Sequence, residues 1–110
     1  MIYISSSCVK EKHICKSIER LVDLGFRNIE LSGGTNLYPE MVDDLKELKD
    51  EFNLNYLLHN YFPPPQDHFV ANIASLDPEI YQRTLVIIYK PSICLKFLKL
   101  KNLVCMLDIY

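Results

Sequence analysis

The stretch GFRNIELSGGT, residues 25–35, combines a helix end, a strand and a turn. Gly25 predicts a left-handed stop after the helical pattern that precedes it. NIELS, residues 28–32, has the length of a short strand and is followed at once by a glycine pair. The stretch therefore predicts one repeat of an alternating strand and helix arrangement.

The residues on either side of this stretch continue the alternation. MIYIS, residues 1–5, is a β-branched run and a strand candidate, and NYLLH, residues 55–59, is a third strand. Between the first two strands, residues 13–26 place apolar side chains at helical spacing, namely Ile14, Ile18, Leu21 and Val22. The sequence therefore predicts a helix between the first and second strands.

Two further helices are predicted from periodicity and end signals. After Pro39, which a first helical turn tolerates, apolar side chains recur at helical spacing, namely Met41, Leu45, Leu48 and Phe52. Asn53 resembles the end of that helix. Asp77, Pro78 and Glu79 then read as an N-cap, a first-turn proline and a first-turn acid, which open a third helix.

The fold class follows from the order of these elements. The three strands begin near residues 2, 28 and 55, a spacing of one βα unit. Near-continuous apolar strands alternating with helices predict an α/β fold whose parallel sheet is buried on both faces. Three such units do not close a barrel, and an open sheet would leave two edges exposed.

Length, apolar content and cysteine spacing limit the class of protein to which the chain can belong. The 110 residues, 49% of them apolar, suit one small domain, and no apolar run is long enough for a membrane span. The N-terminus lacks the features of a secretory signal, and the four cysteines form no CxxC pair, which indicates reduced thiols and a cytoplasmic location. We therefore expect no membrane partner.

Polar residues follow each predicted strand, where parallel α/β folds carry their sites. His59 ends the third strand, and a neutral imidazole there could bind zinc, manganese or a similar ion. The alternative is a rim histidine bonded to a backbone carbonyl. Glu30 lies inside an apolar strand, where a carboxylate is costly to bury unless it is paired, for example with Arg27, or bound to a metal.

Other strand-end residues are less specific. Cys8 could be a nucleophile, but a small buried thiol is the preferred interpretation because no partner base is evident. Ser32, Gly33 and Gly34 could bind a phosphate through backbone N–H groups or form a plain turn. Tyr61, Phe62 and the three prolines that follow could form a rigid substrate wall or a stiff loop.

Four segments together resemble one family of proteins. SSSCVK, GFRNIELSGGT, NLNYLLHNYFPPP and FVANIAS are similar to the N-terminal part of sugar phosphate isomerase/epimerase proteins, which are xylose isomerase-like TIM barrels related to family 2 AP endonucleases. The resemblance covers about residues 1–85. It implies the first three βα units of an incomplete (β/α)₈ TIM barrel with a divalent-metal site.

The resemblance also implies roles for particular residues. His59, in a segment similar to the third strand of the endonuclease branch, would be a metal ligand, and Glu30 a site-facing residue that we assign as catalytic. Asn60, Tyr61 and Ser32 would bind a small sugar phosphate. The remaining metal-binding carboxylates of such barrels lie on later strands, so the zinc, manganese or magnesium ion is expected in a complete barrel and not on this chain alone.

The last 25 residues, VIIYKPSICLKFLKLKNLVCMLDIY (86–110), differ from the rest. Residues 1–85 have 8 Lys and Arg against 13 Asp and Glu, a net charge of −5, whereas residues 86–110 have 4 Lys against 1 Asp, a net of +3. The many apolar residues disfavour a nucleic-acid-binding arm. Pro91 should interrupt the third helix, and no fourth strand is evident.

A frameshift would explain the unusual composition of this segment. Read one base earlier, its possible codons permit S-D-H-I-Q-A-I-D-L-S-K, an amphipathic helix, and later L-G-V-H-A-G-Y, a strand like the fourth strand of the family. We hypothesise that residues 86–110 are an out-of-frame translation that ends at a premature stop codon. The alternative is a genuine but divergent tail that packs on the sheet.

Three functions follow as hypotheses. The first is a metal-dependent isomerase or epimerase of sugar phosphates, in which a base moves a proton between adjacent carbons. The second is an AP endonuclease-like nuclease, which the net charge of −5 over residues 1–85 disfavours. The third is a truncated product without catalysis. The sequence leaves the oligomeric state open.

Overall fold

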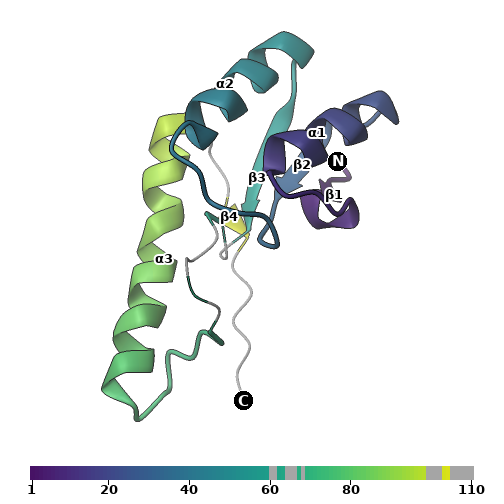
Figure 1. The fold of residues 1–110 in the computed structure, drawn as a ribbon. Helices are drawn as coiled ribbons and strands as arrows, with labels where there is room; N and C mark the ends of the chain where they lie inside the picture. Colours follow the sequence, from purple (N-terminus) through teal and green to yellow (C-terminus); the bar gives the residue numbers. More distant parts are fainter. Residues whose placement is uncertain (60–61, 64–66, 68, 99–102, 105–110) are drawn as a thin grey trace.

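The computed structural model describes residues 1–59, 62–63, 67, 69–98 and 103–104. They form an α/β fold of three helices beside a parallel sheet (Figure 1). In chain order the elements are β1 (Ile4–Ser5), the 3₁₀ helix η1 (Ser6–Cys8), α1 (Ile14–Asp23), β2 (Asn28–Leu31), α2 (Met41–Phe52), β3 (Asn55–His59), α3 (Pro78–Leu98) and β4 (Leu103–Val104).

The sheet has its four strands in sequence order, β1-β2-β3-β4, and every neighbouring pair is parallel. Ile29 of β2 pairs with Ile4 of β1 on one side and with Tyr56 of β3 on the other. The predicted α/β class with a parallel sheet is therefore confirmed. The first strand is shorter than predicted, because only Ile4 and Ser5 of residues 1–5 pair with β2.

Helix α1 forms where the apolar period predicted it. Its predicted core side chains are all buried, namely Ile14, Ile18, Leu21 and Val22. Gly25 has a φ of +95°, a conformation that a glycine adopts without a Cβ penalty. The Phe26 N–H donates to the Leu21 carbonyl at 3.0 Å, which satisfies one of the last helical carbonyls.

Helix α2 buries Met41, Leu45 and Leu48 and ends at Asn53, whose left-handed φ of 52° confirms the predicted helix stop. The Leu54 N–H donates to the Lys49 carbonyl at 2.9 Å across this end. The predicted start differs slightly. The helix begins at Met41 with Glu40 as its N-cap, so Pro39 lies just outside the first turn.

Helix α3 begins at Pro78, as predicted. The Asp77 carboxylate caps it by accepting a hydrogen bond from the Glu79 N–H at 2.9 Å. The predicted interruption at Pro91 is wrong, since α3 continues to Leu98 and the chain then enters β4 beside β3. A parallel neighbour for β3 needs a crossover of a dozen or more residues, and α3 supplies it. No helix in the described part of the chain is long and apolar enough to cross a membrane.

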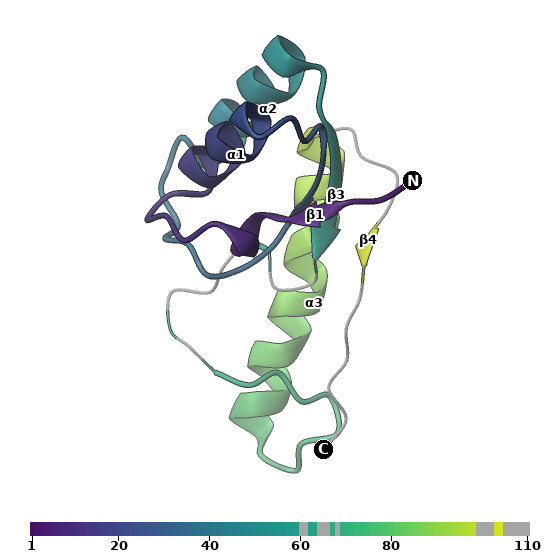
Figure 2. The ribbon, with the colours of Figure 1, turned by 90° about the vertical axis from the view of Figure 1, so that its right-hand side faces the viewer.

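The helices lie in a row on one face of the sheet. Helix α2 packs between α1 and α3, and Figure 2 shows α1 and α2 on the same side of β1 and β3. Right-handed crossovers between strands in sequence order place every helix on one face. The prediction of a sheet buried on both faces is therefore wrong for the described residues.

Burial along the strands shows the same asymmetry. In β2 and β3 the buried side chains alternate with half-buried or exposed ones, because successive side chains of a strand point to opposite faces. The helix-facing set is Ile29, Leu31, Tyr56 and Leu58. The other set lies on what we call the bare face, the sheet surface opposite the helices.

Tyr56 is the polar exception in the core between the sheet and the helices. Its side chain is 5% exposed, and its hydroxyl donates to the Leu45 carbonyl of α2 at 3.0 Å. Burial is the main cause that raises the pKa of Tyr56 above its ordinary value, and the charges of Cys15 and Asp50 raise it further. The tyrosinate form is therefore disfavoured in the folded protein.

This raised pKa predicts a loss of stability at alkaline pH. Since the folded-state pKa lies above the unfolded-state value of about 10, Tyr56 contributes stability that is complete below that pH and is lost as the pH rises above it. We expect the free energy of unfolding to fall by about 1.4 kcal/mol per pH unit there because of Tyr56. Urea titrations of the wild type and Tyr56→Phe above about pH 10 measure this. Equal slopes in the two proteins would contradict it.

Candidate functional site

The bare face carries polar side chains toward the carboxyl ends of the strands. Glu30 of β2 lies between Ser5 of β1 and Leu57 of β3 in the parallel register. His59 stands two residues beyond Leu57 on the same face of β3, so it is a diagonal neighbour of Glu30. The structure thus brings together the predicted catalytic carboxylate and the predicted metal-binding histidine.

Glu30 is half-buried on this face, and no hydrogen bond or ion pair of its carboxylate occurs among the described residues. The alternative of an ion pair with Arg27 is wrong. The Arg27 guanidinium instead donates to the carbonyls of Val22 at 3.0 Å and Phe26 at 2.9 Å, where it helps to close the end of α1. A carboxylate that has no internal partner is available to a substrate or a metal ion.

His59 is also half-buried, at the last position of β3. Its carbonyl accepts a hydrogen bond from the Phe62 N–H at 2.9 Å. The predicted substrate-binding residues Asn60 and Tyr61 lie outside the described residues. The role of His59 as a metal ligand stays a prediction.

Ser32 directly follows β2, and a hydrogen bond joins it to Ser6 of η1, the residue directly after β1. Its backbone N–H donates to the hydroxyl of Ser6, which is 1% exposed, at 2.9 Å. That N–H is therefore engaged inside the protein and cannot bind a phosphate. Gly34 has a φ of +95°, as a turn of this kind requires, and the Ser32 hydroxyl stays a predicted substrate contact.

Cys8 corrects another expectation. Its thiol is exposed at the end of η1, whereas the sequence favoured a buried position. Cys8 is the last residue of the 3₁₀ helix η1, which Ser5 caps by accepting a hydrogen bond from the Ser7 N–H at 3.3 Å.

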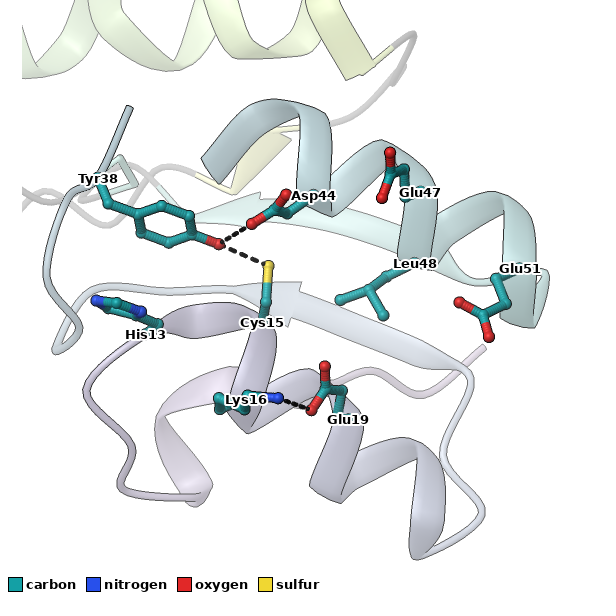
Figure 3. Close-up of a pocket in the computed structure, with 9 residues that line it drawn as sticks. All are labelled: His13, Cys15, Lys16, Glu19, Tyr38, Asp44, Glu47, Leu48 and Glu51. Atoms are coloured by element: carbon teal, nitrogen blue, oxygen red, sulfur yellow. Dashed lines mark hydrogen bonds and ion pairs between the residues drawn. The ribbon is translucent and has the colours of Figure 1, made fainter. Parts of the chain in front are cut away.

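A hollow lies between α1 and α2, on the helical side of the sheet, and the sequence did not indicate it (Figure 3). Its volume is about 350 Å³. The lining residues come from the two helices and the segments before them, namely His13, Cys15, Lys16, Glu19, Tyr38, Asp44, Glu47, Leu48 and Glu51. Four of the nine carry carboxylates, so the hollow is acidic.

Tyr38 contacts three of the other residues that line this hollow. Its hydroxyl lies 3.0 Å from the Cys15 thiol and 2.9 Å from an Asp44 carboxylate oxygen, and its ring stacks on His13 with centroids 4.6 Å apart (Figure 3). Burial raises the pKa of the Cys15 thiol, although the Tyr38 hydrogen bond opposes that rise. Burial also raises the pKa of Tyr38. The thiol is therefore held in its unreactive protonated form.

No sequence pattern indicates that Tyr38, Cys15 and His13 lie together. Tyr38 lies in the segment before α2, 23 residues from Cys15, and only the packing of α2 on α1 joins them. His13 precedes α1 and could be read only as a helix boundary residue. No periodicity or spacing rule relates these positions, so three-dimensional packing was needed to find them.

Tyr38→Phe should measure the contribution of this hydrogen-bonded bridge. Loss of the hydroxyl removes the contacts with Cys15 and Asp44, and we expect the free energy of unfolding to fall by about 1 kcal/mol. Urea unfolding would show a lower midpoint with an unchanged slope. Tyr81→Phe is the matched control, because Tyr81 is 38% exposed on α3; a loss as large there would contradict the assignment.

The described residues do not complete a metal centre. Catalytic zinc usually takes three protein ligands, and the bare face supplies two donors, the imidazole of His59 and the carboxylate of Glu30. In the part of the chain that the structure describes, no group of three or more His, Cys, Asp or Glu side chains could hold a metal ion. These residues fit part of a donor set and not the whole of it.

Comparison with known proteins adds no assignment. No family model, curated protein or solved structure matches this chain.

Proposed function

We propose that residues 1–85 are the first three βα units of a TIM barrel that isomerises or epimerises sugar phosphates. One observation carries this proposal: the strands follow sequence order with every helix on one face, and Glu30 and His59 lie together on the other. In a TIM barrel the inner face of the sheet is free of helices, and the site lies at the carboxyl ends of the strands.

The main competing α/β architecture is the doubly wound sheet. Its strand order reverses near the middle of the sheet, and its helices cover both faces. The described sheet has neither feature, since its order is β1-β2-β3-β4 and α2 packs on both α1 and α3. The resemblance of residues 1–85 to sugar phosphate isomerases and epimerases supports the same architecture.

In this function Glu30 would be the base. Its carboxylate has no internal partner in the described structure and points from the middle of β2 into the proposed barrel interior. A carboxylate so placed can take the proton from the carbon next to a substrate carbonyl and return it to the neighbouring carbon. The Ser32 hydroxyl, at the end of the same strand, would hold a polar group of the sugar phosphate.

A divalent ion would polarise the substrate oxygens when bound. His59 is the residue that would bind it, with further ligands from strands that the described residues do not contain. We therefore expect no isomerase activity from a single copy of the 110-residue chain. The open sheet in itself cannot surround a substrate.

The gene tests the proposal. We would sequence it across codon 84 and well past codon 110, translate the −1 frame, and produce the protein in that frame. The proposal predicts further alternating strands and helices with His, Glu and Asp at strand ends, and activity on ketose or aldose phosphates. Activity on abasic DNA instead would identify the nuclease alternative. A restored protein inactive on both substrates would contradict the proposed function.

A further inference from the structure

We propose that the hollow between α1 and α2 binds a linear aliphatic polyamine, whose ammonium groups pair with carboxylates of α2 and whose methylene chain contacts Cys15 and Leu48. The hollow lies on the helical side of the sheet, whereas Glu30 and His59 lie on the bare face. The proposal therefore does not depend on the proposed function, and it can be tested on the 110-residue chain.

The hollow has the size and the mixed lining of a small-molecule site. Its volume of about 350 Å³ lies near the lower end of the range for ligand pockets, which suits a small or narrow ligand. Cys15 of α1 and Leu48 of α2, each 8% exposed, supply apolar surface between the two helices. In Figure 3 the stacked rings of His13 and Tyr38 lie at one end of the hollow and Glu51 at the other. The hollow therefore offers apolar contact at its centre and polar groups along its length.

One side of the hollow is a line of carboxylates on α2. Asp44, Glu47 and Glu51 stand at positions i, i+3 and i+7, so they share a helix face with Leu48. At a rise of about 1.5 Å per residue, the backbone positions of Asp44 and Glu51 are about 10 Å apart along the helix axis. Among the described residues no three His, Cys, Asp or Glu side chains are grouped so as to hold a metal ion. The carboxylates are thus too widely spaced for one ion but suit a chain that carries several positive charges.

The negative charges of this line are not balanced inside the protein. In the part of the chain that the structure describes, the carboxylates of Glu47 and Glu51 make no hydrogen bond or ion pair. Lys16, which also lines the hollow, pairs with Glu19 of its own helix at 2.7 Å. Like charges at i and i+4 destabilise a helix, and Glu51 lies in the last turn of α2, where the helix dipole favours cations. A bound polycation removes both penalties, so a ligand explains an arrangement that stability alone does not.

The lining favours an aliphatic polyamine over a cation with a single charge. Each ammonium group donates charge-assisted hydrogen bonds to a carboxylate, while the methylene segments cover apolar surface as the stem of a lysine does. At the end near Asp44 the ammonium group also lies near the Tyr38 ring, and aromatic rings attract cations. A single ammonium group meets only one of the carboxylate positions. The affinity should therefore rise with the number of ammonium groups.

Calorimetric titration of the reduced full chain with spermidine, at about 0.1 M salt, tests the site. We expect one spermidine per chain, and binding weaker by about tenfold in Glu47→Gln/Glu51→Gln, because two exposed ion pairs are lost. Asp43→Asn/Asp50→Asn is the matched control, since it removes two carboxylates of α2 that do not line the hollow. It should change the dissociation constant by less than about twofold, because salt screens charges at that distance. Equal weakening in the two double variants, or no binding to the wild type, would overturn the proposal.

Two further measurements separate this site from a general attraction of cations. Butylamine, which has one ammonium group, should bind about tenfold more weakly than spermidine, and equal affinity for butylamine or for Mg²⁺ would overturn the polyamine assignment. Without ligand, Glu47→Gln/Glu51→Gln should unfold at a urea concentration no lower than the wild type does, since it removes like charges from one helix face. A lower midpoint would overturn the argument that these charges await a ligand.

Discussion

Leu58→Ala should lower the free energy of unfolding by about 2–5 kcal/mol, the range for removing a fully buried leucine side chain. Leu58 is 0% exposed on the helix-facing side of β3, and its backbone pairs with Leu31 of β2. Truncation would leave a cavity at the centre of the apolar core between the sheet and the helices. The measurement is the urea midpoint of the purified variant and wild type at one protein concentration.

The matched control for this variant is Leu24→Ala. Leu24 ends α1 with 70% of its surface exposed, so its truncation should change stability by no more than about 0.5 kcal/mol. Similar losses at the two positions would mean that the helix-facing side of β3 is not the core. That result would contradict the arrangement of helices on one face of the sheet.

Glu30→Gln should abolish most of the proposed isomerase activity. The amide keeps the size of the side chain but cannot accept the substrate proton, and loss of a general base typically lowers the rate by about 10²–10⁴-fold. We expect this loss in kcat, with a smaller change in KM, in the protein translated from the −1 frame. The assay follows interconversion of ketose and aldose phosphates at saturating divalent metal.

Glu40→Gln provides the control for this second variant. Glu40 is an exposed carboxylate at the N-cap of α2, where its side chain makes no capping hydrogen bond. The substitution removes the same charge from the outer side of the protein and should leave kcat within about twofold. If both variants kept full activity, Glu30 would not be the base, and the bare face would lose its proposed catalytic role.

Much of the fold could be predicted because local signals agreed with tertiary packing. The apolar period of α1 coincides with its buried face, and Gly25 and Asn53 end helices in the left-handed conformations expected of them. Asp77 likewise caps α3 as its spacing to Glu79 indicated. These features depend on residues within one or two turns of each other, so sequence reasoning can reach them.

The wrong predictions depended on distant parts of the chain. The effect of Pro91 was judged from the proline alone, whereas the crossover from β3 to β4 retains a continuous helix. A continuously apolar strand such as β3 was taken as buried on both faces, but only the positions of the helices decide which face is covered. The bridge from Tyr38 to Cys15 and Asp44 depends on the packing of two helices, which no local pattern encodes.

The frameshift hypothesis stays a prediction. Helix α3 runs across the predicted junction between residues 85 and 86, so the described backbone has no break there. The composition of residues 86–110 still differs from that of the preceding chain in charge and in apolar pattern. The gene sequence decides between an out-of-frame segment and a genuine tail. Either result leaves the arrangement of β1, β2 and β3 unchanged.

The strand order tests the central claim most directly, because the bare face and its pair of polar side chains follow from it. We would measure nuclear Overhauser contacts between backbone protons of neighbouring strands in the labelled chain. The account predicts contacts between Ile4 and Ile29 and between Ile29 and Tyr56, with β2 between β1 and β3. Contacts that place β1 between β2 and β3, as in doubly wound sheets of strand order 2-1-3-4-5, would contradict it.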